Sequence, residues 1–172
     1  MGAWDVGTFD NDTASDWAYE LHGAWDLSVV RAAIEAVLVT GADYLEADLA
    51  AKALAAGEVI ARLRGRGCDL RSYSEAVDRW VDAHPLVPPD ELVEQAIEAI
   101  DRILGLASEL AETWDESDDR ETWRVVVGAM SVHHAMHHLT PGALVITPGD
   151  REDILLAAGA SLTRHDASSV LA

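Results

Sequence analysis

The chain has 172 residues, 49% of them hydrophobic and 25% charged, so it is long enough to bury a core and too apolar to be disordered throughout. Its formal net charge is −19, and Lys52 is its one lysine. Because so acidic a surface repels phosphate backbones and anionic lipids, we expect neither nucleic-acid binding nor membrane binding. The charge suits a basic protein partner, although acidity also serves solubility alone.

Cysteine usage and hydropathy favour a cytoplasmic protein. Cys68 is the single cysteine, so no disulfide can form within the chain and a reducing compartment is expected. No apolar run approaches the roughly 18 residues that a transmembrane helix requires, and we expect no signal peptide.

The first stretch of the chain predicts an aromatic arm followed by a helix. Trp4 and Phe9 lie in the arm, and we expect them to pack onto later helices because burying a Trp contributes roughly 2–3 kcal/mol. The three residues from Asp10 to Asp12 are all good helix caps, and Thr13 with Asp16 offers a variant of the capping box. One apolar stripe then marks the helix: Ala14, Trp17, Ala18 and Leu21.

Four further helices follow from periodicity and end signals. The second is capped by Asp26 or Ser28 and ends at Thr40–Gly41, and the third runs from about residue 46 to 64 with small residues in its middle. Ser74 opens the fourth, which His84–Pro85 ends. The fifth starts at Pro88–Asp90 and continues past a kink at Gly105 toward Leu110 and Trp114.

Four arginines form a local basic cluster around the end of the third helix. They are Arg62, Arg64, Arg66 and Arg71. One interpretation is a phosphate or partner site. The other is that they complement helix C-termini and pair with the abundant carboxylates, and this second interpretation agrees better with the composition.

The pattern of residue types changes near Arg124. Residues 121–124 start either a sixth helix or a strand, and from Val125 onward the pattern is β-α-β-α with short connections. Two parallel strands with two short helices cannot satisfy their own edges, so this piece must add to the helical domain, to a second copy or to a partner chain. The last residues, 161–172, predict a flexible tail.

The predicted fold is therefore mainly α, a domain of five or six helices over residues 1–124, with a short β-α-β-α extension over residues 125–160. The abrupt change near Arg124 also fits two halves joined by fusion, in which case the extension has no evolved role.

Several motifs of the front part resemble one family. The pattern M-G-A-W-x-x-G-x-F-D-N-D-x-A-x-D-W at residues 1–17 is similar to the signature of the bacterial "domain of unknown function 4259" family. DYLEA at residues 43–47 and EVIARLRGR at residues 58–66 resemble later blocks of that family. The resemblance covers about residues 1–124. It implies no catalytic residue, because none is known for the family.

The back part resembles a different family. VVGAMSVHHAMHHLTPGALVITPGDREDILLAA, residues 126–158, is similar to part of the DRTGG domain of bacterial phosphotransacetylases. In those enzymes the domain precedes the catalytic domain and is regarded as regulatory. The catalytic domain has no counterpart here, so the resemblance implies a regulatory role and not acetyl transfer.

Three groups of residues are candidates for binding. Four histidines fall within six residues and form two pairs at the i,i+4 spacing with which helices chelate zinc, but no third ligand is evident for either pair: His133, His134, His137 and His138. A turn before a helix could present backbone N–H groups to an anion or nucleotide, or could simply cap that helix: Pro148, Gly149, Asp150 and Arg151. Aromatic side chains are candidates for interaction: Trp4, Phe9, Trp25 and Trp114, of which Trp25 and Trp114 lie at element ends.

No catalytic constellation is assembled by these residues. The leading hypothesis is a small acidic cytoplasmic protein, not an enzyme, that acts by contact with an unidentified protein partner or by self-association. The first alternative is a ligand-sensing regulatory module built on the DRTGG-like segment. The second is a metal-binding protein that uses the four histidines. We expect no cofactor beyond adventitious zinc or nickel.

Overall fold

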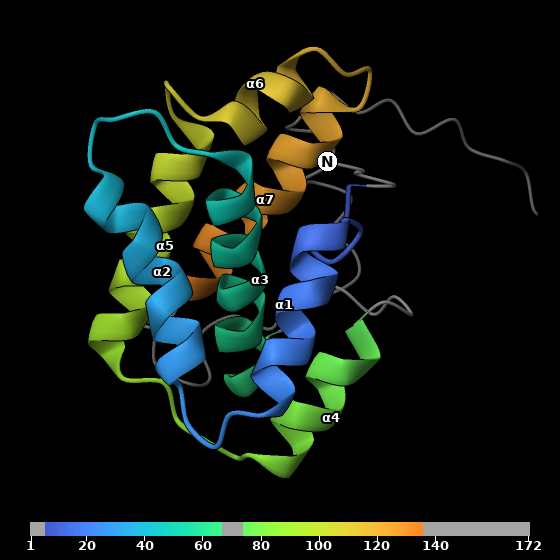
Figure 1. The fold of residues 1–172 in the computed structure, drawn as a ribbon, viewed down its shortest axis with the longest axis vertical. Coiled ribbons are helices and arrows are strands. Elements are labelled where there is room, and N and C mark those ends of the chain that lie inside the picture. Colours follow the sequence, from blue (N-terminus) through green and yellow to red (C-terminus); the bar gives the residue numbers. More distant parts are fainter. Residues whose placement is uncertain (1–5, 67–73, 136–172) are drawn as a thin grey trace, which may run out of the picture. The chain divides into compact units, whose positions relative to one another are not determined.

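The computed structural model describes residues 6–66 and 74–135, and these residues form seven helices (Figure 1). The helices are α1 Asp12–His22, α2 Ser28–Thr40, α3 Ala47–Leu63, α4 Glu75–Ala83, α5 Asp90–Leu104, α6 Glu109–Asp115 and α7 Arg120–Ala135. All of them belong to one compact unit, Met1–His138. The predicted mainly helical fold is confirmed, with more helices than the five or six expected.

Helix α3 is the centre of this unit. It contacts each of the other six helices, and Figure 1 shows it between α2 and α1 with α7 behind. Nearly every residue from Ala50 to Ala61 is buried. Most of these residues are alanine or glycine, so neighbouring helices can approach closely and no broad side chain separates them. The small-residue pattern in the sequence predicted this packing.

Helix α1 begins where the capping residues predict, but only one of them caps it. The Asn11 side chain accepts a 2.8 Å hydrogen bond from the Ala14 amide. The expected Thr13–Asp16 capping box does not form, because Thr13 donates its hydroxyl to Asp48 on α3 at 2.9 Å. The predicted stripe of α1 is buried as expected: Ala14, Trp17, Ala18 and Leu21.

Helices α2 and α5 run parallel to each other. Near their N-termini Arg31 approaches Gln95 at 3.5 Å, and at their C-termini Arg102 donates to the Gly41 carbonyl at 2.7 Å. Helix α5 ends at Leu104, so the expected kink at Gly105 is wrong. Instead Gly105 is the first residue of a short connection to α6.

The strand predicted from Val125 is wrong, because residues 124–130 lie inside α7. Trp123, Val127 and Met130 are buried at offsets of four and seven, which places them on one helix face against the core. Burial of this face outweighs the strand preference of the β-branched run Val125–Val127. The helix passes through Arg124 without a break and carries core residues on both sides of it.

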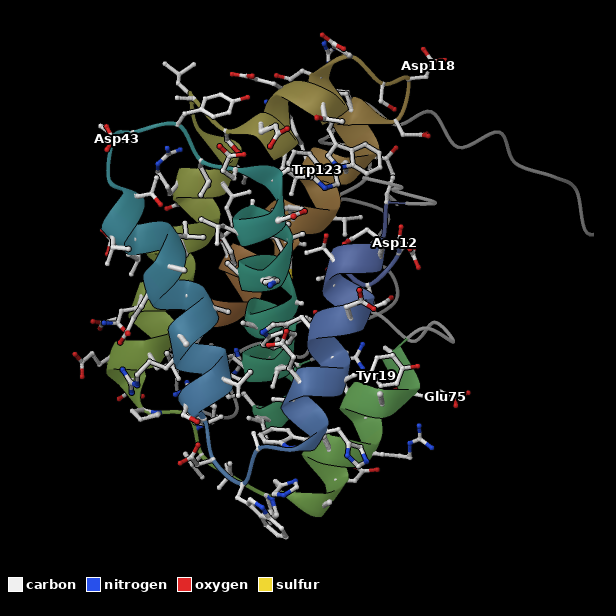
Figure 2. All side chains as sticks on the ribbon, in the orientation of Figure 1. Asp12, Tyr19, Asp43, Glu75, Asp118 and Trp123 are labelled. Carbon is white, nitrogen blue, oxygen red and sulfur yellow. The ribbon has the colours of Figure 1, made fainter. Side chains whose placement is uncertain are left out.

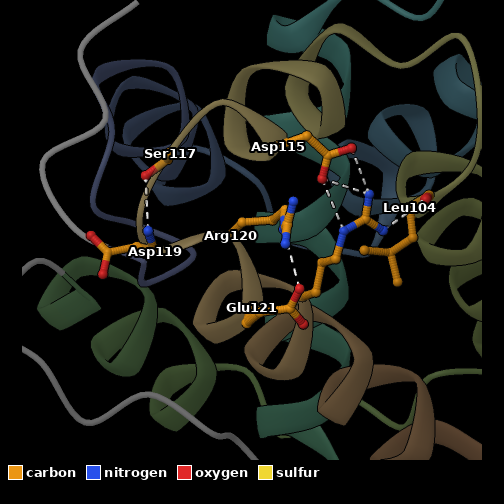
Figure 3. A network of polar contacts seen from close by, with 7 residues as sticks. Leu104, Asp115, Ser117, Asp119, Arg120 and Glu121 are labelled. Carbon is orange, nitrogen blue, oxygen red and sulfur yellow. Dashed lines mark hydrogen bonds and ion pairs between the residues drawn. The ribbon is translucent and has the colours of Figure 1, made fainter.

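The turn between α6 and α7 is held by the polar contacts of Figure 3. Arg124 donates to both carboxylate oxygens of Asp115, at 2.9 and 3.0 Å from Nη2, and its Nη1 reaches the Leu104 carbonyl at 3.3 Å. One side chain on α7 thereby ties the ends of α5 and α6. The Ser117 hydroxyl oxygen accepts from the Asp119 amide at 3.1 Å just before α7 begins.

Residues 131–135 of the predicted β-α-β-α extension continue α7, and its remainder from residue 136, including the strand pattern at residues 143–148, lies outside the described residues, as does the tail 161–172. The boundary between the two predicted parts stays a prediction. Among the helices of residues 6–66 and 74–135, none has the length and apolar character needed to cross a bilayer.

Candidate functional site

Trp25 forms the most prominent aromatic feature on the described surface. It lies in the connection between α1 and α2, at the lower end of the helices in Figure 1, and 85% of it is exposed. The ring of His84 meets Trp25 edge to face, with centroids 5.8 Å apart. In the sequence Trp25 lies at an element end and is one of the aromatic candidates for interaction.

The neighbours of Trp25 hold this end of the unit in a defined arrangement. His84 stacks on Trp80 with ring centroids 4.7 Å apart, and its Nδ1 lies 2.8 Å from the Trp80 carbonyl oxygen. The buried Trp80 indole donates from Nε1 to the Ala24 carbonyl at 2.8 Å, directly before Trp25. The exposed ring therefore projects from a connection that is anchored to α4. We call Trp25 and His84 the Trp25 surface.

Asp26, the residue after Trp25, contacts the start of α2. The Asp26 carboxylate accepts a 2.9 Å hydrogen bond from the Ser28 amide at the start of α2. Hydrogen bonds from the Ser28 hydroxyl and amide lower the pKa of Asp26 below its ordinary value. The cap position of α2 is Leu27, whose side chain makes no capping hydrogen bond, so neither Asp26 nor Ser28 is the cap residue that the sequence predicted.

A buried charge network joins α3 to α4. Arg62, with only 7% of its side chain exposed, pairs with Glu58 at 3.0 Å and with Asp78, and its guanidinium lies 5.6 Å from the Phe9 ring centroid. Glu58 is fully buried. Arg64 makes an analogous contact with Asp90 at 3.0 Å, at the first turn of α5. These pairs support the interpretation that the arginines complement carboxylates.

A small recess lies between the arm and the α6–α7 region. It is lined mainly by apolar side chains, and the parallel rings of Trp114 and Trp123 stack there with centroids 5.7 Å apart. Its interior has room for about one water molecule, far less than the roughly 300–1,000 Å³ of a ligand pocket. The recess is a packing feature of the arm and not a small-molecule site.

The structure separates the predicted interaction residues from one another. Phe9 is buried in the core, Trp114 is partly buried against Trp123, and Trp25 is exposed. Trp4 lies outside the described residues. Phe9 therefore acts as a core residue, and of the described members Trp25 is the one presented to solvent.

The other predicted binding groups are not brought together by the described part of the chain. His133 and His134 lie on α7, and their side chains are outside the description. The remaining candidates lie outside the described residues altogether: His137, His138, Pro148, Gly149, Asp150 and Arg151. A metal site and an anion site stay predictions.

The network around Arg62 was not predicted from the sequence. Its signal was visible in the i,i+4 spacing of Glu58 and Arg62, which places the two side chains on one helix face. The third member, Asp78, comes from α4, and no local pattern could have paired it with Arg62.

Comparison with known families finds two matches, which together cover most of the chain. The profile of the family described as "Domain of unknown function (DUF4259)" matches residues 2–125. The chain belongs to the DUF4259 family. Its matched segment contains α1 to α6 and the start of α7, so all of the described surface features above fall within the DUF4259 region.

A second profile, that of the DRTGG domain, matches residues 105–167 of this DUF4259 protein. Both resemblances noted in the sequence are confirmed. The two matches share residues 105–125, which include all of α6 and the first turns of α7. Neither match identifies a catalytic domain.

One curated relative supports the DRTGG assignment. The chain is 46% identical over 41 residues to a phosphate acetyltransferase of Pseudomonas aeruginosa, a match that spans 24% of this chain and 6% of that enzyme. No solved structure matches the chain.

Proposed function

We propose that this DUF4259 protein is a non-enzymatic cytoplasmic protein that acts by binding another protein through the Trp25 surface. The observation that carries the proposal is the exposed ring of Trp25, anchored through His84 and Trp80. Tryptophan is enriched among the residues that dominate binding energy at protein interfaces. An aromatic ring that is already held in place loses little conformational freedom on binding, so more of its contact energy appears as affinity.

Affinity capture from a native lysate tests this proposal with a matched pair of variants. The full chain, Trp25→Ser and Tyr19→Ser serve as baits, since Tyr19 is also an exposed aromatic residue but lies on α1. We expect proteins that bind the wild type to be lost with Trp25→Ser and kept with Tyr19→Ser. Light scattering of the same three proteins tests self-association by the same logic.

Two results would remove the proposal. One is retention of the same captured proteins by both variants. The other is the absence of any stable partner together with a measured enzymatic turnover.

A second function, ligand sensing, is favoured by the DRTGG match over residues 105–167. Thermal-shift screening with nucleotides and acyl phosphates tests it on the full chain and on a chain ending at His138, the boundary of the compact unit. Ligand stabilisation of the full chain that the shortened chain lacks would support sensing. A cut at Arg124 would not be informative, because it removes Val127 and Met130 from the core.

A further inference from the structure

The end of the helices opposite Trp25 carries a second group of exposed apolar side chains. Tyr44 follows α2 and is 49% exposed, and Leu106 follows α5 and is 94% exposed. This is the upper end of the helices in Figure 1, and Asp43 is labelled there in Figure 2, which has the same orientation. Because α2 and α5 run parallel, both connections leave the same end of the unit. We call Tyr44 and Leu106 the Tyr44–Leu106 surface.

One arginine holds the two connections together. Arg102, in the last turn of α5, donates to the carbonyl oxygens of Gly41 at 2.7 Å and Asp43 at 2.6 Å in the first connection. The same guanidinium donates to the carbonyl oxygens of Leu106 at 3.0 Å and Ala107 at 3.3 Å in the second. A guanidinium presents its donors in a rigid planar fork, so these contacts fix the spacing between the two segments.

Backbone pairing completes the arrangement. The Leu45 amide donates to the Ala107 carbonyl at 2.9 Å, and the Glu109 amide donates to the Leu45 carbonyl at 3.0 Å, as in a single step of a parallel sheet. Ala107 adopts φ +56°, an uncommon conformation for a residue with a side chain, which the surrounding contacts must sustain. The exposed Leu106 therefore sits on a connection that is tied down on both sides of it.

Carboxylates outnumber basic side chains around this surface. Four carboxylates are near Tyr44: Asp43 is its neighbour in the chain, Glu112 accepts its hydroxyl at 3.0 Å, and the charges of Glu46 and Glu109 act on it together with that of Glu112. The guanidinium of Arg102 is directed at backbone carbonyls. The nearby Arg124 is paired with Asp115. The surface thus offers apolar contact within a negative field.

We propose that the Tyr44–Leu106 surface binds a basic segment of a partner protein that carries large apolar side chains between its lysines or arginines. Apolar side chains of the partner cover Leu106 and the Tyr44 ring, and its cations face the surrounding carboxylates. The rigid spacing set by Arg102 reduces the entropy lost on binding. This inference goes beyond the proposed function, because it concerns the end remote from Trp25 and names the partner's chemistry.

Fluorescence anisotropy with three synthetic peptides of equal length tests the proposal on the full chain. One peptide contains lysine and leucine in helical amphipathic order, one has glutamine in place of leucine, and one has glutamate in place of lysine. We expect the lysine–leucine peptide to bind. Leu106→Ser should weaken its affinity about tenfold, since burying a leucine side chain on binding contributes a free energy of the size that a tenfold change in affinity requires. Val87→Ser is the matched control, because Val87 is 86% exposed and lies before the start of α5, at the other end of that helix.

Each result decides the matter. Preference for the lysine–leucine peptide, with loss at Leu106→Ser and not at Val87→Ser or Trp25→Ser, supports the proposal. Equal binding of the lysine–glutamine peptide would show attraction by charge alone and overturn it, as would equal effects of the Leu106 and Val87 variants or no binding at millimolar peptide. Binding of the lysine–leucine peptide that only Trp25→Ser weakens would overturn this inference while favouring the Trp25 surface.

Discussion

The indole Nε1 of Trp80 donates a 2.8 Å hydrogen bond to the carbonyl oxygen of Ala24, and this contact joins α4 to the connection between α1 and α2. Trp80 is buried, so its ring also fills core space, while the hydrogen bond itself is partly buried. The same side chain stacks on His84, which in turn contacts Trp25. The stability of the core and the orientation of the exposed ring therefore depend on one residue.

Substitution of Trp80 should destabilise the protein. Trp80→Phe removes the hydrogen bond and leaves unfilled volume, and we expect the free energy of unfolding to fall by about 2–3 kcal/mol. Trp25→Phe changes an exposed ring and should alter it by no more than about 0.5 kcal/mol. Urea denaturation followed by circular dichroism measures both, and equal effects of the two variants would contradict a core role for Trp80.

The Arg102 contacts should be lost on replacement by lysine. An ammonium group cannot reach four carbonyl oxygens in two segments, so Arg102→Lys should lower the free energy of unfolding by about 1–2 kcal/mol. It should also speed hydrogen exchange of the Leu45 and Glu109 amides, which pair the two connections. Arg79→Lys, at an exposed position on α4, is the control and should leave both amides protected.

The hydroxyl of Tyr44 should ionise at unusually high pH. Its hydrogen bond to Glu112 raises the pKa of Tyr44 above the ordinary value of about 10, and the charges of Glu112, Glu109 and Glu46 act in the same direction. Glu112→Gln removes one charge and should lower that pKa. Phenolate absorbance, with Tyr44→Phe subtracted, reports it, and an unchanged midpoint in the Gln variant would count against the contact.

The direction of this shift also sets a pH dependence for stability. The folded state favours the neutral phenol, so the contribution of Tyr44 is complete below about pH 10 and declines as the pH rises through the raised pKa. The difference in unfolding free energy between the wild type and Tyr44→Phe should therefore shrink in alkaline solution. A difference in unfolding free energy that grows with pH would contradict this pH dependence.

Removal of the Arg62 side chain should cost more than loss of a surface ion pair. Arg62→Met removes the 3.0 Å ion pair with the buried Glu58, and breaking a buried pair from one side lowers the free energy of unfolding by up to about 3–5 kcal/mol. The double variant with Glu58→Leu should regain part of this loss, because the buried carboxylate that had paired with Arg62 is then also gone. Thermal or urea denaturation of the single and double variants measures the coupling, and additive losses would contradict it.

Local signals in the sequence predicted the elements whose packing is decided within one helix. The stripe of α1, its start beside Asn11, the small residues of α3 and the proline-led start of α5 all carry their information within a few turns. Each combines a cap or proline with a 3.6-residue apolar period. Such consistency between local preference and burial is what makes a helix readable.

The residues near 125 could not be assigned in the same way. Val125, Val126 and Val127 prefer strands by type, and a short apolar run does not distinguish a strand from a buried helix by period alone. The deciding contacts are those of Trp123, Val127 and Met130 with the core formed by distant helices. Likewise the pairing of Arg62 with Asp78, and of Arg102 with the carbonyls near Asp43, joins segments far apart in the chain.

The unbroken course of α7 through Arg124 also bears on how the chain could be divided. Cleavage by a protease between Trp123 and Met130 would break the helix that carries core residues on both sides of Arg124. Because that helix is packed against the core, the intact unit should resist cleavage there. A fragment that ends where the DUF4259 match ends, at residue 125, lacks the core residues Val127 and Met130. A fragment designed for crystallisation should therefore retain the whole of α7, all of which lies within the DRTGG match.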